Sequence, residues 1–142
     1  MNKHFETSIV SRSYECDSYN HVNHAVFLNY LEVARIEFLK TMGYTLDSLK
    51  EKNLLMPIVN LEIEYKKQIL AGEKIFITVE WIKRKYSSAF FEQFIYSEDK
   101  SVVISRAVIT WVAVNLQGKP IAIPDELIKQ YEKKYGAIKK DG

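Results

Sequence analysis

The segment NHAVFLNYLEVARIEFLKTM, residues 23–42, decides the fold of this 142-residue chain. At helical spacing its apolar side chains cover far more than one stripe, and only a few polar residues interrupt them. Asn23 is a suitable N-cap and Gly43 a suitable residue after the last turn, so both ends of a helix are marked. Glu32 and Arg35 are expected to form an i, i+3 ion pair on it. A helix this apolar must be enclosed, so the segment predicts a long central helix.

Strands are expected on both sides of this helix. Residues 5–12 are interpreted as a strand, and after Pro57 the apolar period changes from 3.6 to 2. Turns with Gly, Asp, Lys and Pro separate four further strands, as hairpin connections should. These strands are expected at residues 59–65, 75–81, 87–97 and 102–115. Two more helices are expected, a short one capped by Thr45 and a terminal one over residues 125–135 capped by Asp125.

This order of elements predicts an α+β fold in which one antiparallel sheet wraps around the central helix. Residues 1–142 are expected to form a single domain, because this length fits one core and no linker or repeat divides it. A sheet that wraps one side of a helix leaves the other side uncovered. A second copy of the chain is the obvious cover, so we expect a homodimer.

The composition argues against several classes of protein. A net charge of +2 is too small to indicate nucleic-acid binding, and no uncharged apolar run approaches the roughly 18 residues of a membrane helix. The C-terminal lysines, including Lys139 and Lys140, are interpreted as a solvated helix face and a frayed end. The first residues lack the apolar region of a secretory signal, and the single cysteine, Cys16, permits no disulfide within the chain. We expect a cytoplasmic protein without nucleic-acid or membrane partners.

Reactive groups gather in residues 16–24, CDSYNHVNH, immediately before the predicted helix. The glycines permit neither the common phosphate-binding loops nor a nucleophile elbow. The first N–H groups of a helix lack internal partners, and the helix dipole adds positive charge, so this end can stabilise a developing oxyanion. Asp17 is the acid of this loop, and a carboxylate here can act as nucleophile or as base for water. An acid close to a helix N-terminus suits acyl transfer or enolate-type chemistry.

Each residue of this loop also has a structural interpretation. Asp17 can be a turn or Asx-capping residue, and Asn23 can be an N-cap alone. His21 and His24 can be ordinary polar partners of the loop. Cys16, His21 and His24 could be metal ligands, but a fourth ligand is missing, so no metal site is predicted.

The run from Tyr14 to His24, continued by Glu32 and Arg35, resembles the signature of hotdog-fold thioesterases. The relevant branch is that of 4-hydroxybenzoyl-CoA thioesterase and the short bacterial acyl-CoA thioesterases related to it. Its pattern is an acid, a His-Val-Asn-Asn-like step and a helix with Glu-x-x-Arg. Later segments are similar too: Tyr65 before Gly72-Glu73, the Ser87-Ser88 pair, and Ile123-Pro124. The resemblance extends over nearly the whole chain.

The resemblance implies a hotdog fold, a five-stranded antiparallel sheet wrapped around one long central helix, paired into homodimers and often homotetramers. The active site would lie at the dimer interface, with Asp17 as the catalytic acid. His21 matches the histidine of the four-residue step and Asn23 its first asparagine, while His24 stands where a second asparagine is usual. With Ala25 at the helix start, these residues are expected to hold the substrate and its carbonyl oxygen.

The resemblance also implies a place for coenzyme A, which is part of the substrate and not a cofactor. Arg84 and Lys85 lie just before Ser87 and Ser88, at the turn into a strand that the family places beside the bound nucleotide. We expect these four residues to contact CoA, the two cations through its phosphates. The alternative is a solvated basic turn.

Resemblance and position together predict an acyl-CoA thioesterase that releases free acid and CoA. Three alternatives stay open: an acyl-carrier-protein thioesterase, a non-catalytic module that binds acyl-CoA, and a hotdog dehydratase or hydratase. Nothing in these residues adds a DNA-binding helix pair, which weakens the idea of a sensor. The acid precedes the long helix in a thioesterase-like motif, which argues against the dehydratase.

Overall fold

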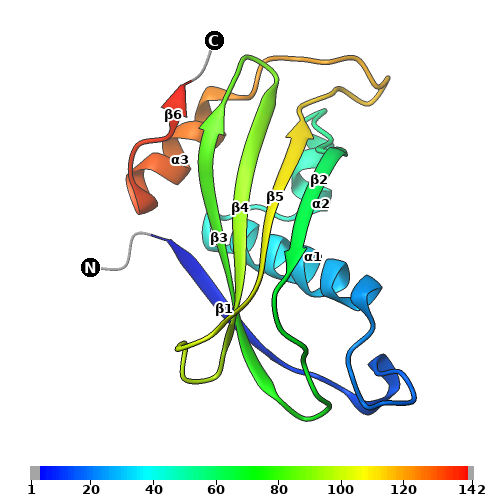
Figure 1. Cartoon of the computed structure of the whole chain (residues 1–142). Coiled ribbons are helices and arrows are strands. Elements are labelled where there is room, and N and C mark those ends of the chain that lie inside the picture. The colour runs from blue at the N-terminus through cyan, green and yellow to red at the C-terminus, as the bar shows by residue number, and fades with distance from the viewer. Residues whose placement is uncertain (1–3, 141–142) are drawn as a thin grey trace.

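The computed structural model describes residues 4–140, so the expectation about a secretory signal falls partly on residues 1–3, outside this range. The elements follow the predicted order (Figure 1). The strands are β1 (Phe5–Val10), β2 (Ile58–Tyr65), β3 (Lys74–Arg84), β4 (Ser88–Ser97), β5 (Val103–Val112) and β6 (Lys139–Lys140). The helices are α1 (His24–Thr41), α2 (Leu46–Glu51) and α3 (Asp125–Tyr135), with one 3-10 turn, η1 (Ser13–Glu15).

The five long strands form one antiparallel sheet in the order β1-β3-β4-β5-β2, and α1 lies across one of its faces (Figure 1). Alternate residues of β4 are buried, as a strand with one face on the core requires. β1 and β2 are the edges of this sheet. The predicted hotdog architecture, one sheet wrapped around one long helix, is confirmed.

The ends of two helices can be compared with the expected caps. The Asn23 side-chain oxygen accepts the Ala25 N–H at 2.9 Å, and Gly43, after the last turn, has a φ of +86°. The expected cap of α3 was wrong. Pro124 is its N-cap residue, and Asp125 is the first helical residue, where its negative charge still suits the helix dipole.

The C-terminal lysines are a second correction. Lys139 and Lys140 form β6, which pairs in parallel with Lys83 and Arg84 of β3. Both lysines are exposed, which is what a charged run predicts. The interpretation as a frayed end was wrong because strand pairing uses the backbone, which a charged side chain does not exclude.

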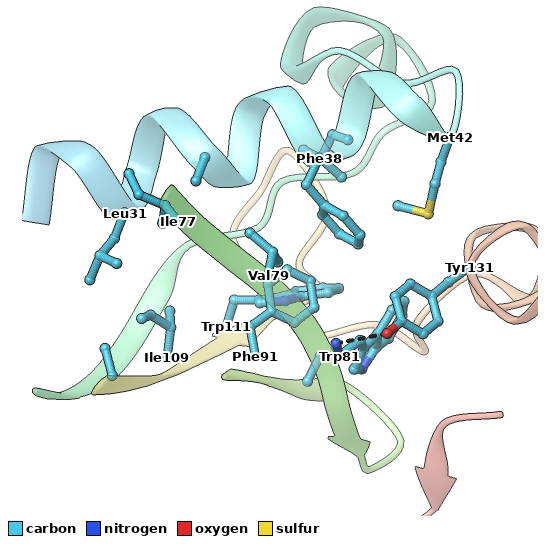
Figure 2. Close-up of a cluster of buried hydrophobic side chains, with 14 of the residues drawn as sticks. Leu31, Phe38, Met42, Ile77, Val79, Trp81, Phe91, Ile109, Trp111 and Tyr131 are labelled. Carbon is cyan, nitrogen blue, oxygen red and sulfur yellow. Dashed lines mark hydrogen bonds between the residues drawn. The ribbon is translucent and has the colours of Figure 1, made fainter. Parts of the chain in front are cut away.

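The core lies between α1, the sheet and α3 (Figure 2). Five aromatic rings fill its centre, with ring centroids 5.5 to 5.8 Å apart: Phe38, Trp81, Phe91, Trp111 and Tyr131. At Trp81 the register of β3 against β4 shifts, and the Trp81 N–H donates to the Tyr131 hydroxyl at 3.1 Å. The Tyr131 side chain of α3 therefore accepts a hydrogen bond from a β3 amide, at a point where the pairing of β3 with β4 is irregular.

One face of α1 is buried and the opposite face is not. Leu28 and Val33 are 37% and 44% exposed, and on the neighbouring edge strand β2 Ile58 and Val59 are 42% and 59% exposed. One copy of the chain therefore does not enclose the helix fully. Within residues 4–140, none of the helices has the length and apolar character that crossing a membrane requires.

Arg35 has a different partner from the one expected. Its Nη1 donates to Gln93 Oε1 at 2.9 Å, and Gln93, fully buried, donates its Nε2 to the Leu31 carbonyl at 3.1 Å. Among the ion pairs of residues 4–140, Glu32 and Arg35 do not appear as a pair. Burial lowers the pKa of Arg35, and the charge of Glu32 opposes that effect. The i, i+3 spacing on α1 predicted Glu32 as the partner of Arg35, but the partner is the buried Gln93 of β4.

Candidate active site

The loop before α1 is a small hairpin that fixes Asp17. Cys16 and Val22 form an antiparallel bridge, and the Asp17 N–H donates to the His21 carbonyl at 2.9 Å. At the tip, the Asn20 N–H donates to the Asp17 carbonyl at 3.0 Å, with Asn20 in the left-handed region at a φ of +64°. Asparagine tolerates this conformation better than most residues, so the tight turn suits the sequence.

The Asp17 carboxylate has one engaged and one unengaged oxygen. Oδ1 accepts the N–H groups of Tyr19 at 2.9 Å and His21 at 3.1 Å, and no hydrogen bond from residues 4–140 reaches Oδ2. The His21 N–H is the main cause that holds the pKa of Asp17 below its ordinary value, and the charges of His21 and His24 add to it. The residue is therefore an Asx-type turn residue and also an ionised carboxylate with a free oxygen.

The start of α1 offers one free amide. The Ala25 N–H, expected to face the substrate carbonyl, is occupied by the Asn23 side chain, and the Val26 N–H donates to the Asn23 carbonyl at 2.9 Å. The His24 N–H has no acceptor within residues 4–140. The N-cap role of Asn23 already implied this occupation, because a cap takes an amide of the first turn. The His24 N–H is therefore the amide that can donate a hydrogen bond to an oxyanion.

A cavity of about 270 Å³ brings the expected loop residues together. Four of the predicted side chains line it: Asp17, His21, Asn23 and His24. It is completed by Val22, Phe27, Lys67 and Gln68. The last two come from the connection between β2 and β3, where the sequence carried no signal for them. That connection is tied to the loop, because the Val22 N–H donates to the Ile69 carbonyl at 2.8 Å and His21 pairs with Leu70.

The three residues considered as metal ligands do not all line this cavity. The Cys16 thiol donates to the Arg12 carbonyl at 3.6 Å, outside the cavity lining. Within the described range, residues 4–140, no three His, Cys, Asp or Glu side chains are grouped as a metal site would need.

The residues expected to hold CoA lie elsewhere. Arg84 ends β3 and Ser88 begins β4, so the turn between them is at the far end of the sheet from the Asp17 loop (Figure 1). Val10, just before that loop, pairs with Lys74, and Arg84 follows ten residues later along β3, about 33 Å at the usual rise per residue. A single chain does not bring this turn to Asp17.

A second cavity, of about 110 Å³, lies further along α1. Its lining is mostly apolar, with two charged residues at the helix: Glu32, Arg35, Ile36, Leu39, Leu46, Met56, Ile58, Phe91 and Trp111. From Phe27 in the first cavity to Ile36 in the second, nine helical residues rise about 14 Å.

Comparisons with known proteins agree on one family. The model described as "Thioesterase-like superfamily" matches residues 11–131. The long-chain acyl-CoA thioesterase FadM of Escherichia coli is 30% identical over 128 residues, which are 89% of this chain and 96% of FadM. The chloroplastic acyl-acyl carrier protein thioesterase ATL3 of Arabidopsis thaliana is 22% identical, over 92% of this chain and 69% of ATL3. The protein SAV2348 of Staphylococcus aureus, solved with CoA, has the same fold, with a TM-score of 0.87 at 16% identity over 100% of this chain and 90% of SAV2348.

Proposed function

The chain belongs to the thioesterase-like superfamily and is a thioester hydrolase, and we propose that it hydrolyses acyl-CoA with Asp17 as its catalytic nucleophile or general base. One observation carries the proposal. Asp17, whose carboxylate has a free oxygen, and His24, whose amide has no acceptor within residues 4–140, line the same cavity. These are the two groups that attack on a thioester carbonyl requires, one on the carbon and one on the oxygen.

Two routes use this geometry. In the nucleophilic route, Asp17 Oδ2 bonds to the carbonyl carbon, the C–S bond breaks, and water then hydrolyses the mixed anhydride. In the general-base route, Asp17 takes a proton from water as that water attacks, and the proton passes to the departing thiolate. In both, the His24 N–H supports the negative charge on the carbonyl oxygen, and the products are the free acid and CoA. The lowered pKa keeps Asp17 in the anionic form that either route needs.

The acyl group is proposed to be a fatty chain. FadM acts on long-chain acyl-CoA by name, and the second cavity supplies an apolar space further along the helix that begins at the first. ATL3 supports a second candidate, hydrolysis of an acyl-acyl carrier protein. Rates on matched acyl-CoA and acyl-carrier-protein substrates separate the two. The proposal includes the cytoplasmic location expected from the sequence, and it needs no cofactor, because CoA is part of the substrate.

We propose a homodimer joined at the β2 edges, with a homotetramer as its further assembly. β2 is a sheet edge with exposed Ile58 and Val59, and α1 beside it exposes Leu28 and Val33. A two-fold axis through paired antiparallel β2 strands would invert the second sheet. The Arg84 turn of one copy would then lie at the same end as the Asp17 loop of the other, which is how the CoA contacts expected from the sequence can serve this site.

The function is tested by thiol release from acyl-CoA of varied chain length with Asp17→Asn. The change is nearly isosteric, and the asparagine oxygen can still accept the Tyr19 and His21 amides. Loss of a nucleophile or base should lower kcat by on the order of 10²–10⁴. The matched control is Asp99→Asn, another turn aspartate whose Oδ1 accepts bonds from Ser97 and Ser101. Wild-type turnover by a folded Asp17→Asn would exclude the mechanism, and wild-type protein that binds acyl-CoA without releasing thiol would favour the non-catalytic module.

A further inference from the structure

Glu15 lies two residues before Asp17 and outside the cavity lining, yet its side chain reaches into the protein. Its side chain is 14% exposed, whereas the adjacent Tyr14 is 80% exposed. Glu15 Oε1 accepts the Tyr30 hydroxyl at 2.6 Å and the Arg12 N–H at 2.8 Å. Tyr30, in the second turn of α1, is almost completely buried at 2%. The carboxylate of the loop is therefore bonded to the interior of the helix.

The backbone of Glu15 makes a second connection to the same helix. Its carbonyl accepts the N–H of the N-cap residue Asn23 at 3.0 Å. The next residue, Cys16, closes the hairpin that carries Asp17 by pairing with Val22. The hairpin is thus held to α1 at its base through one residue, by a backbone bond at the helix start and a side-chain bond about two turns later.

The protonation states suit a strong hydrogen bond. Burial raises the pKa of Glu15, but hydrogen bonds from Tyr30 and Arg12 more than offset this, so the pKa lies below its ordinary value and the carboxylate is ionised at neutral pH. Burial, followed by the bond to Glu15, raises the pKa of Tyr30, so the hydroxyl keeps its proton. Hydrogen bonds between a neutral donor and an ionised acceptor are shorter and stronger than neutral ones.

We propose that Glu15 and Tyr30 are a positioning pair, whose hydrogen bond sets the place of the Asp17 carboxylate relative to the free amide of His24. Neither side chain lines the cavity, so neither contacts the thioester. Both groups that act on the carbonyl depend on the pair, because Asp17 sits on the hairpin and His24 begins the helix. Small displacements between reacting groups have large effects on rate. The inference rests on the proposed role of Asp17.

Tyr30→Phe tests the pair, since it removes only the hydroxyl. We expect kcat to fall by roughly 10- to 100-fold with KM within about twofold, because substrate contacts are unchanged. Glu15→Gln keeps an acceptor oxygen and should retain more kcat than Glu15→Ala. The control is Tyr135→Phe, which deletes a hydroxyl bonded to Thr41 at the other end of α1 and should leave kcat unchanged.

Stability, measured by urea unfolding, separates positioning from a structural role. If the pair had only a structural role, its substitutions would lower the free energy of unfolding and leave kcat of the folded enzyme unchanged. That result would overturn the proposal. Equal kcat for Glu15→Gln and Glu15→Ala would overturn it as well, and this comparison holds if Tyr30→Phe does not fold. If Asp17→Asn keeps wild-type turnover, the proposed function fails instead, so the two failures are distinguishable.

Discussion

The hydroxyl of Tyr65 donates to the backbone carbonyl of His24 at 3.2 Å, and its ring lies 4.5 Å from the His24 imidazole, centroid to centroid. Tyr65 is the last residue of β2, and His24 is the first of α1. The edge strand therefore fixes the residue whose amide is free at the helix start. His24 also contacts Phe27, at 6.3 Å between ring centroids, so its side chain forms part of an aromatic wall beside the cavity.

Tyr65→Phe should lower kcat with little change in KM. The ring contact with His24 stays, and only the hydroxyl that orients the helix start is lost. A net hydrogen bond contributes about 0.5–1.5 kcal/mol, which corresponds to a fall in rate of up to roughly tenfold. Thiol-release kinetics measure this, with Tyr135→Phe as the control because its hydroxyl bonds to Thr41 at the other end of α1. Equal losses in both variants would argue against a role for this hydroxyl.

The Asp17 carboxyl should titrate below the ordinary aspartate value of about 3.9. Its amide partners, the His21 N–H foremost, favour the anion, so the folded pKa is lowered and protonation requires a lower pH. Activity that depends on this anion should persist as pH falls to the ordinary value and be lost only below it. Carbon-13 NMR of carboxyl-labelled protein measures the pKa directly, and Asp17→Asn assigns the signal. A titration at or above the ordinary value would contradict the geometry.

Tyr131→Phe should destabilise the protein without altering catalysis. It leaves the Trp81 N–H buried without an acceptor, at a cost of about 1–3 kcal/mol in the free energy of unfolding. Burial is the first cause that raises the pKa of Tyr131 to about 12, so this hydroxyl remains protonated through the neutral and mildly alkaline range. Urea unfolding at pH 7 measures the effect. An unchanged midpoint and slope would show that water or a shifted backbone satisfies the amide.

Local patterns were sufficient to predict most of the fold. The apolar run of α1, its N-cap Asn23 and the period of two after Pro57 each report on neighbours in the chain, so they gave the elements and their order. The pairing of β6 with β3 could not be predicted, because two exposed lysines have no periodicity. The partner of Arg35 was missed for a related reason, since Gln93 lies 58 residues away and no local spacing indicates it.

The same limit applied to the candidate site. The loop around Asp17 could be recognised because its chemistry is contiguous and precedes a helix. Lys67 and Gln68 reach the cavity only through tertiary contacts of the connection between β2 and β3. The distance from Asp17 to the Arg84 turn follows from strand direction, which hydropathy does not encode. The resemblance therefore assigned Asp17 and the Arg84 turn to one site, although the two lie far apart within a single chain.

Val59→Lys should shift the protein from dimer to monomer and reduce activity with it. The side chain is 59% exposed on the β2 edge, and a charge on an edge opposes pairing with another strand. Light scattering should give at least twice 16.6 kDa for wild type and 16.6 kDa for the variant. The control is Val10→Lys on the opposite edge, β1, where Val10 is 52% exposed and the mass should stay that of wild type. A wild-type monomer that is active at micromolar concentration would contradict the prediction.

Arg84→Ala with Lys85→Ala should raise KM for acyl-CoA with little change in kcat, because phosphate contacts far from the carbonyl are equal in ground and transition states. The defect should shrink as salt rises, since exposed contacts are screened.

Whether this turn serves the Asp17 of its own chain or of the other copy is decided by mixed dimers. One subunit carries Asp17→Asn and the other carries the Arg84 and Lys85 substitutions, with different purification tags. If the contacts cross the dimer, one of the two sites has wild-type Asp17 and a wild-type basic turn, so activity appears with the wild-type KM. If each turn serves its own chain, the only site with Asp17 keeps the raised KM. An unchanged KM in the double variant at low ionic strength would assign Arg84 and Lys85 to the solvent.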